Sequence, residues 1–90
     1  MSYTQSYTES QIEQIVKDYI VKEFMYERNN GVLSNDLNLI KARIVDSTGI
    51  ISLIYFVEDK FGFNLNLEEE SLDNFATVNA IKSLVIAKLH

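Results

Sequence analysis

The group in this sequence that is best placed to take part in a chemical reaction is the hydroxyl of Ser47. It follows Asp46 and precedes a strongly apolar stretch, so it stands where a helix is expected to begin. A hydroxyl at the first position of a helix lies beside backbone N–H groups that have no partner within the helix. Ser and Asp are also among the commonest N-cap residues, so the dipeptide leaves open whether Ser47 has a chemical role or only caps the helix.

Two neighbours of Ser47 weaken the capping interpretation. Gly49 stands in the first helical turn, where glycine costs about 1 kcal/mol relative to alanine and often permits the close approach of another group. Ile50 occupies the position where a capping box starting at Ser47 would need Glu or Gln. Both features favour a role for Ser47 beyond capping.

Other side chains offer little catalytic or metal-binding chemistry. The one histidine is His90, which we expect to be a solvated terminus, and the sequence has no cysteine. Neither a Ser-His pair nor a zinc cluster can be assembled from these residues. The acidic run Glu68–Glu70 lacks the alternating ligands of a calcium-binding loop and predicts a solvated helix start rather than a metal site. A hydrolase that uses Ser47 would lack an identifiable base, so we predict no enzymatic activity and no catalytic residues.

Composition and charge exclude several classes of partner. The chain has 90 residues, which suits one domain, and a formal net charge of −5. A protein with a pI near 4.7 is a poor ligand for phosphate backbones, so we expect no nucleic-acid partner. The longest apolar stretch is far shorter than the roughly 20 residues of a membrane span, and the first residues lack the basic region of a signal peptide. We expect a soluble, monomeric, cytoplasmic protein that does not enter a membrane.

The elements that would position Ser47 are expected to be helices. The sequence has no proline and three glycines, and its apolar residues recur at helical intervals. Residues 1–7 are polar and predict a flexible tail, which leaves residues 8–90 as the folded domain.

A first helix is expected to begin after Thr8, whose spacing to Gln11 suits a capping box. It would end near Glu27, because the sequence Asn29–Gly31 is typical of a helix C-terminus. The residues expected on its inner face include Ile12, Ile15, Val16, Tyr19 and Ile20.

Residues 32–45 show no sustained period but contain many large apolar side chains. Long loops are uncommon in small domains, so we predict a connector that is pinned against the core by these side chains. They are Leu33, Leu37, Leu39, Ile40 and Ile44.

A second helix is predicted over residues 47–61, and Gly62 suits its C-cap. It is apolar nearly all round, and a core of this size cannot surround it, so part of it must face a partner. The side chains expected to face the core are Ile50, Leu53, Ile54, Val57 and Phe61. The side chains expected to face outward on the Ser47 side are Thr48, Ile51 and Tyr55.

Two further helices complete the prediction of an all-α fold with three long helices and one short. Asn66 and Glu69 have capping spacing for a short helix over residues 68–74, and Thr77 is expected to cap the last helix. The inner stripe of that helix would contain Val78, Ile81, Leu84, Val85 and Leu89. Two lysines, Lys82 and Lys88, are expected toward its negatively polarised end.

Two motifs in this arrangement resemble the acyl and peptidyl carrier proteins. In that family an Asp-Ser pair, like Asp46–Ser47 here, opens the second helix of a four-helix bundle. Residues 57–62 (VEDKFG) are similar to the acidic run, phenylalanine and turn that end this helix in the family. About thirty residues after the serine, residues 73–81 (DNFATVNAI) are similar to the Phe-x-Thr-Val-x-x-Ile pattern that joins the third and fourth helices. The resemblance spans roughly residues 12–89.

The resemblance implies that a phosphopantetheinyl transferase attaches a 4′-phosphopantetheine arm to Ser47, with Asp46 as the flanking motif residue. A phosphodiester there would sit at a helix N-terminus, which favours negative charge. The thiol of the arm would hold an acyl or aminoacyl group as a thioester for a loading enzyme and for downstream acyl-processing enzymes. The surface read by these partners would contain Thr48, Ile51, Tyr55, Glu58 and Asp59.

The start of the second helix differs from that of fatty acid synthase carriers. Those carriers usually have Leu after the serine and further acids, whereas residues 47–52 here read STGIIS. This start is more similar to stand-alone carriers of specialised, secondary-metabolite pathways than to a housekeeping carrier. The alternative is a small helical protein–protein interaction module whose exposed apolar helix binds a partner without any cofactor.

Overall fold

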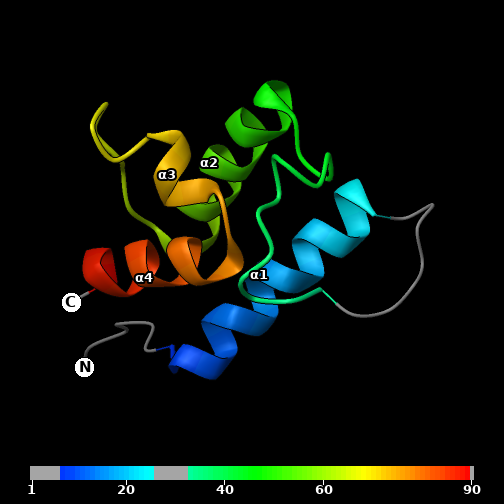
Figure 1. Cartoon of the computed structure of the whole chain (residues 1–90). Coiled ribbons are helices and arrows are strands. Elements are labelled where there is room, and N and C mark those ends of the chain that lie inside the picture. The colour runs from blue at the N-terminus through cyan, green and yellow to red at the C-terminus, as the bar shows by residue number, and fades with distance from the viewer. Residues whose placement is uncertain (1–6, 26–32, 90) are drawn as a thin grey trace, which may run out of the picture.

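The computed structural model describes residues 7–25 and 33–89, which form four helices and no strand. The helices are α1 (Glu9–Phe24), α2 (Ser47–Phe61), α3 (Leu72–Phe75) and α4 (Val78–Leu89). α4 packs against each of the other three helices (Figure 1). The prediction of an all-α bundle with three long helices and one short helix is therefore confirmed for this part of the chain. None of these four helices is long and apolar enough to cross a bilayer.

α1 begins at the predicted capping box. The Thr8 N–H donates to Gln11 Oε1 at 2.8 Å, and the Gln11 N–H donates to Thr8 Oγ1 at 3.1 Å. The helix ends at Phe24, because Met25 leaves helical geometry with φ −119° and ψ 13°. The prediction of an end near Glu27 is therefore wrong, and the expected stop signal at residues 29–31 lies outside the described residues.

The core is formed by the apolar stripes of α1, α2 and α4, together with Phe75 of α3 and buried side chains of the loops, among them Leu65 and those of the connector. The five residues predicted for the inner face of α2 are all buried. The buried residues of the three helices are Ile12, Val16 and Ile20; Gly49, Ile50, Leu53, Ile54, Val57 and Phe61; and Val78, Ile81 and Val85. Four other predicted core residues are only half-buried at the margin of this cluster: Ile15, Tyr19, Leu84 and Leu89.

The connector before α2 packs against the core, as predicted. Leu33 and Leu39 are buried, and Ile40 and Ile44 are half-buried against the core. Leu37 is exposed, because it lies at the end of a turn in which its N–H donates to the Ser34 carbonyl at 3.3 Å. The connector is thus held by a subset of the expected leucines.

Leu39 joins the connector to the corner between α3 and α4. Its N–H donates to the Ala76 carbonyl at 2.7 Å, and its carbonyl accepts the N–H groups of Ile44 and Val45 at 2.9 and 3.1 Å. These bonds fix the backbone that leads directly into Asp46. The start of α2 is therefore positioned by the corner between α3 and α4.

A second tie lies in the first turn of α4. The Asn79 N–H donates to the Asn35 carbonyl at 3.1 Å, and Asn79 Nδ2 donates to Asp36 Oδ1 at 2.7 Å. The first turn of α4 is capped as predicted, because the Ala80 N–H donates to Thr77 Oγ1 at 3.0 Å. The connector and the α4 N-terminus are therefore held together at several points.

Tyr7, which we expected in the flexible tail, belongs to the packed domain. Its ring packs edge-to-face on Phe61 with 5.0 Å between centroids, and its side chain is half-buried against the core. The rest of the expected tail lies outside the described residues. Tyr7 is therefore part of the folded domain.

The short third helix begins later than the sequence indicates. Asn66 and Glu69 do form the expected reciprocal bonds, with 2.9 Å for each N–H to the partner side chain. These bonds close only a turn, and α3 starts at Leu72 after Ser71, whose hydroxyl accepts the Asn74 N–H at 3.4 Å.

Lys82 lies in the middle of α4 and does not serve its C-terminal end. Its Nζ contacts Glu13 Oε1 at 3.1 Å and so links α4 to α1. Lys88 is the basic residue of the last turn, and its Nζ contacts Glu69 Oε1 at 3.1 Å. Of the two lysines, Lys88 alone lies where it interacts favourably with the helix dipole.

Candidate functional site

The N-cap of α2 is Asp46. Its backbone is extended, with φ −97° and ψ −175°, and its Oδ1 accepts the Gly49 N–H at 2.8 Å. Its carbonyl accepts the Ile50 N–H at 2.9 Å and opens the helical hydrogen-bond pattern. The interpretation of Ser47 as the capping residue is therefore wrong, because a neighbour already performs that task.

Ser47 is the first helical residue, and its side chain is exposed. Within the described residues its hydroxyl makes no hydrogen bond, and the N–H groups of Ser47 and Thr48 have no backbone or side-chain acceptor. A free hydroxyl thus stands beside free donors at the positive end of a helix dipole. This arrangement suits an anionic ester on the serine oxygen.

Gly49 is explained by packing rather than by the approach of a ligand. It is buried, and a Cβ at this position would lie 2.8 Å from Val45 Cγ1 and 2.9 Å from Phe24 Cε1. The group that approaches closely is therefore the protein's own core. Gly49 is therefore required by the packing of the helix and does not indicate a chemical role of Ser47.

The outward face of α2 is the one predicted. Thr48 is exposed, and Ile51 and Tyr55 are 52% and 66% exposed. These residues continue upward along the helix from Ser47 at helical spacing. The structure therefore brings them to one side of the hydroxyl.

The two acids near the end of α2 differ in their surroundings. Glu58 is half-buried, and its Oε2 accepts the Leu65 N–H at 2.8 Å, so it secures the loop that follows the helix. Asp59 is exposed and makes no hydrogen bond or ion pair with other described residues. Of the pair, Asp59 has both oxygens free for a partner.

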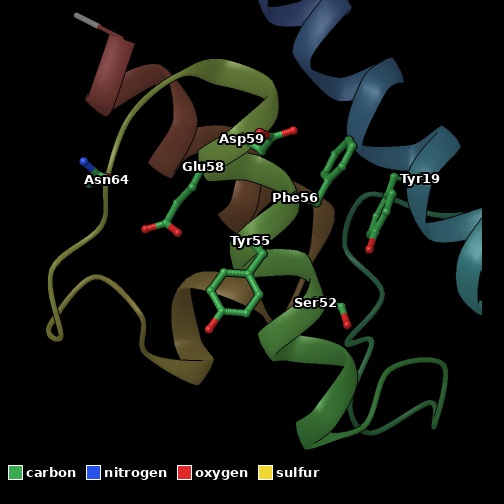
Figure 2. A pocket seen from close by; sticks show the side chains of 7 residues that line it. All are labelled: Tyr19, Ser52, Tyr55, Phe56, Glu58, Asp59 and Asn64. Carbon is green, nitrogen blue, oxygen red and sulfur yellow. The ribbon is translucent and has the colours of Figure 1, made fainter.

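An open groove of about 790 Å³ extends over the outward side of α2. Figure 2 shows its walls: Tyr55 and Glu58 project on one side of the helix, and Phe56 faces Tyr19 of α1 on the other. The residues that line it are Tyr19, Ser52, Tyr55, Phe56, Glu58, Asp59 and Asn64. Four of these, Tyr19, Ser52, Phe56 and Asn64, were not identified as site residues from the sequence.

The wall between α1 and α2 is a stacked aromatic pair. The rings of Tyr19 and Phe56 lie 3.9 Å apart between centroids at an interplanar angle of 11°. Burial raises the pKa of the Tyr19 hydroxyl, and the nearby carboxylate of Glu23 raises it further. The tyrosine is therefore neutral at physiological pH and acts as a rigid apolar wall.

Two carboxyl groups away from the groove have lowered pKa values, chiefly because of hydrogen bonds. Lys82 lowers the pKa of Glu13, chiefly through its hydrogen bond, and the Asn66 backbone and Lys88 lower that of Glu69. No group of three or more potential metal ligands occurs in residues 7–25 and 33–89, and His90 lies outside them. Of the acids at residues 68–70, Glu69 uses its side chain in a turn with Asn66 and in an ion pair with Lys88.

Comparison of this chain with protein-family models, curated proteins and solved structures gave no match.

Proposed function

We propose that this protein is a stand-alone carrier whose Ser47 is esterified by a 4′-phosphopantetheine arm. The observation that carries the proposal is the division of tasks at the start of α2. Asp46 caps the helix at 2.8 Å, and the exposed hydroxyl of Ser47 is left without a structural function. A serine that is presented in this way is suited to modification by another protein.

The residues at the helix start fit a phosphodiester. Attachment would form a bond from Ser47 Oγ to the pantetheine-bearing phosphorus of coenzyme A and break the pyrophosphate bond, with adenosine 3′,5′-bisphosphate leaving and the hydroxyl proton passing to the transferase. The N–H groups of Ser47 and Thr48 and the helix dipole favour the resulting negative charge. The bound arm supplies a thiol, which carries the acyl or aminoacyl group as a thioester.

The connector keeps this serine in place. The paired bonds to the Leu39 carbonyl and the bond from its N–H to Ala76 fix the approach to Asp46. Gly49 lets α2 pack closely on Val45 and Phe24. A partner enzyme would therefore meet Ser47 on a rigid corner, which supports a carrier-like bundle in which the second helix presents the arm.

The exposed face of α2 supports a role in partner recognition. Thr48, Ile51, Tyr55 and Asp59 are all exposed along the helix that begins at the serine. In this proposal they contact the transferase, a loading enzyme and the enzymes that process the carried group. The carrier acts as a monomer in the cytoplasm and serves a specialised pathway, in keeping with the weakly charged start of α2.

Intact mass spectrometry tests the proposal. The protein is incubated with coenzyme A and a broad-specificity phosphopantetheinyl transferase, and the expected result is a mass increase of one phosphopantetheine group. Ser47→Ala should abolish the increase, whereas Ser52→Ala, at an exposed serine of the same helix, should retain it. An unmodified wild-type chain would overturn the carrier proposal and favour the interaction module, for which the exposure of Ile51 and Tyr55 is the supporting observation.

A further inference from the structure

We infer that the groove along α2 receives the carried group, and that this group is an aminoacyl group with a free ammonium. The inference rests on the proposed function, because the arm on Ser47 delivers the group. Its own basis is the position of the groove, the charge of its lining and the contrast with a neighbouring hollow.

The groove lies within reach of the arm. Tyr55 follows Ser47 by eight residues, which corresponds to about 12 Å along a helix with a 1.5 Å rise. A phosphopantetheine chain has about fourteen bonds between the serine oxygen and its sulfur, and at the extension of a polypeptide it reaches roughly 16 Å. An arm that folds along α2 therefore places its thioester beside Tyr55.

The lining of the groove is negatively charged. Glu58 and Asp59 contribute two carboxylates, and no Lys or Arg occurs among the described residues that line it. Asp59 has both oxygens free, and Glu58 uses one oxygen for the Leu65 N–H. A thioester-bound amino acid carries an ammonium close to its carbonyl group, so these acids attract it and repel an acyl group that ends in a carboxylate.

Aromatic rings add to the preference for a cation. Tyr55 lies on the same face as Asp59, and Phe56 and Tyr19 form the stacked wall (Figure 2). The faces of such rings attract ammonium groups, and their area accommodates an apolar side chain. The groove therefore combines a site for the ammonium with surface for the side chain of the amino acid.

A neighbouring hollow of about 290 Å³ has the opposite charge balance. It shares Tyr19 and Phe56 with the groove, but its charged residues are Lys22, Lys60 and Asp18. A carried group that ends in a carboxylate would be drawn to these lysines. The two hollows thus distinguish carried groups by charge.

Nuclear magnetic resonance of the loaded carrier tests this inference. The full-length ¹⁵N-labelled protein is loaded enzymatically with an arm that bears phenylalanine through a stable amide in place of the thioester. Identical samples carry N-acetylphenylalanine, a succinyl group or the unloaded arm, all at low salt because exposed charges are otherwise screened. Amide shifts are compared with those of the unloaded arm.

The free-amine cargo should shift the amides of Ser52, Tyr55, Asp59 and Asn64, and N-acetylation should remove most of these shifts. Asp59→Asn should reduce them in the same way. Asp73→Asn, which removes an exposed acid outside the groove lining, should leave them unchanged. The succinyl group should instead shift the amides of Lys22 and Lys60.

Equal shifts from the amine and N-acetyl forms, or no shift beyond that of the unloaded arm, would overturn the inference while leaving the carrier proposal intact. Insensitivity to Asp59→Asn would overturn it as well. Failure of the arm to attach, seen first by mass spectrometry, would instead overturn the carrier proposal on which the inference rests.

Discussion

The carboxylate of Asp46 accepts the backbone N–H of Gly49 at 2.8 Å, so the cap of α2 is provided by the residue before Ser47. The two residues at the helix start therefore have separate tasks. Asp46 stabilises the helix, and Ser47 presents its hydroxyl to solvent. A modification on Ser47 would leave the cap untouched.

Asp46→Ala should destabilise the fold, whereas Ser47→Ala should not. Loss of an N-cap costs about 0.5–2 kcal/mol, and substitutions at exposed positions without a structural function usually lie within about 0.5 kcal/mol. Urea denaturation measures both free energies of unfolding. Asp46→Asn, which keeps a capping oxygen, should be close to the wild type. Equal losses in the two alanine variants would show that Ser47 shares the cap.

Gly49→Ala should destabilise the protein, although alanine is the better helix former. The new methyl group would lie 2.8 Å from Val45 Cγ1 and 2.9 Å from Phe24 Cε1. Overpacking costs about 1–3 kcal/mol, which offsets and exceeds a propensity gain of about 1 kcal/mol. Thermal unfolding measures the net effect. The loss should be smaller when Phe24→Leu is also present, and a raised melting temperature in Gly49→Ala alone would contradict the packing.

Acid should weaken the fold through Glu13 and Glu69. The Lys82 bond to Glu13 and the Asn66 and Lys88 bonds to Glu69 hold both pKa values below 4.5. A carboxyl with a lowered pKa in the folded state stabilises the fold above its unfolded pKa, and this stabilisation is lost as the pH falls through the folded pKa. The free energy of unfolding should therefore drop as the pH falls below 4.5.

Urea denaturation at a series of pH values checks this dependence. Lys82→Met should flatten the part that belongs to Glu13, whereas Lys41→Met, at an exposed lysine, should retain the wild-type profile. An unchanged pH profile in Lys82→Met would show that the ion pair does not lower the pKa of Glu13.

Ile51→Ala and Tyr55→Ala should slow loading of the holo protein by its partner enzyme. Both side chains are exposed on the helix that begins at Ser47, and aromatic residues are common anchors of interfaces. The start of α2 carries few acids, so the loading rate should depend only weakly on salt. Leu67→Ala, at an exposed leucine outside α2, serves as the control in the rate measurement. Steep salt dependence with little effect of either alanine would show that the acids govern recognition.

Local signals were sufficient to predict much of the fold. The capping box of Thr8, the cap at Thr77 and the Gly62 terminus of α2 depend on residues a few positions apart. The inner stripe of α2 follows from helical spacing, which also places Ile51 and Tyr55 outward. Patterns of this range are readable because one turn of helix determines them.

Contacts between distant residues were not predictable in the same way. Tyr19 and Phe56 stack across two helices, and Asn64 reaches the groove from a loop, yet no spacing in the sequence relates them. The choice between Asp46 and Ser47 as cap depends on backbone angles, because both residue types cap well. The sequence therefore indicated the serine of the candidate site, whereas the groove beside it could be described only from the tertiary structure.

The bond from the Leu39 N–H to the Ala76 carbonyl also has a consequence for biosynthesis on the ribosome. Translation proceeds from the N-terminus, so Ser47 leaves the exit tunnel before Ala76 and α4 are available to lock the connector. Until then the connector before Ser47 lacks the hydrogen bond from Leu39 to Ala76. The connector before the candidate site is therefore locked only after the residues up to Ala76 have emerged, so the nascent chain differs there from the folded protein that a transferase would meet.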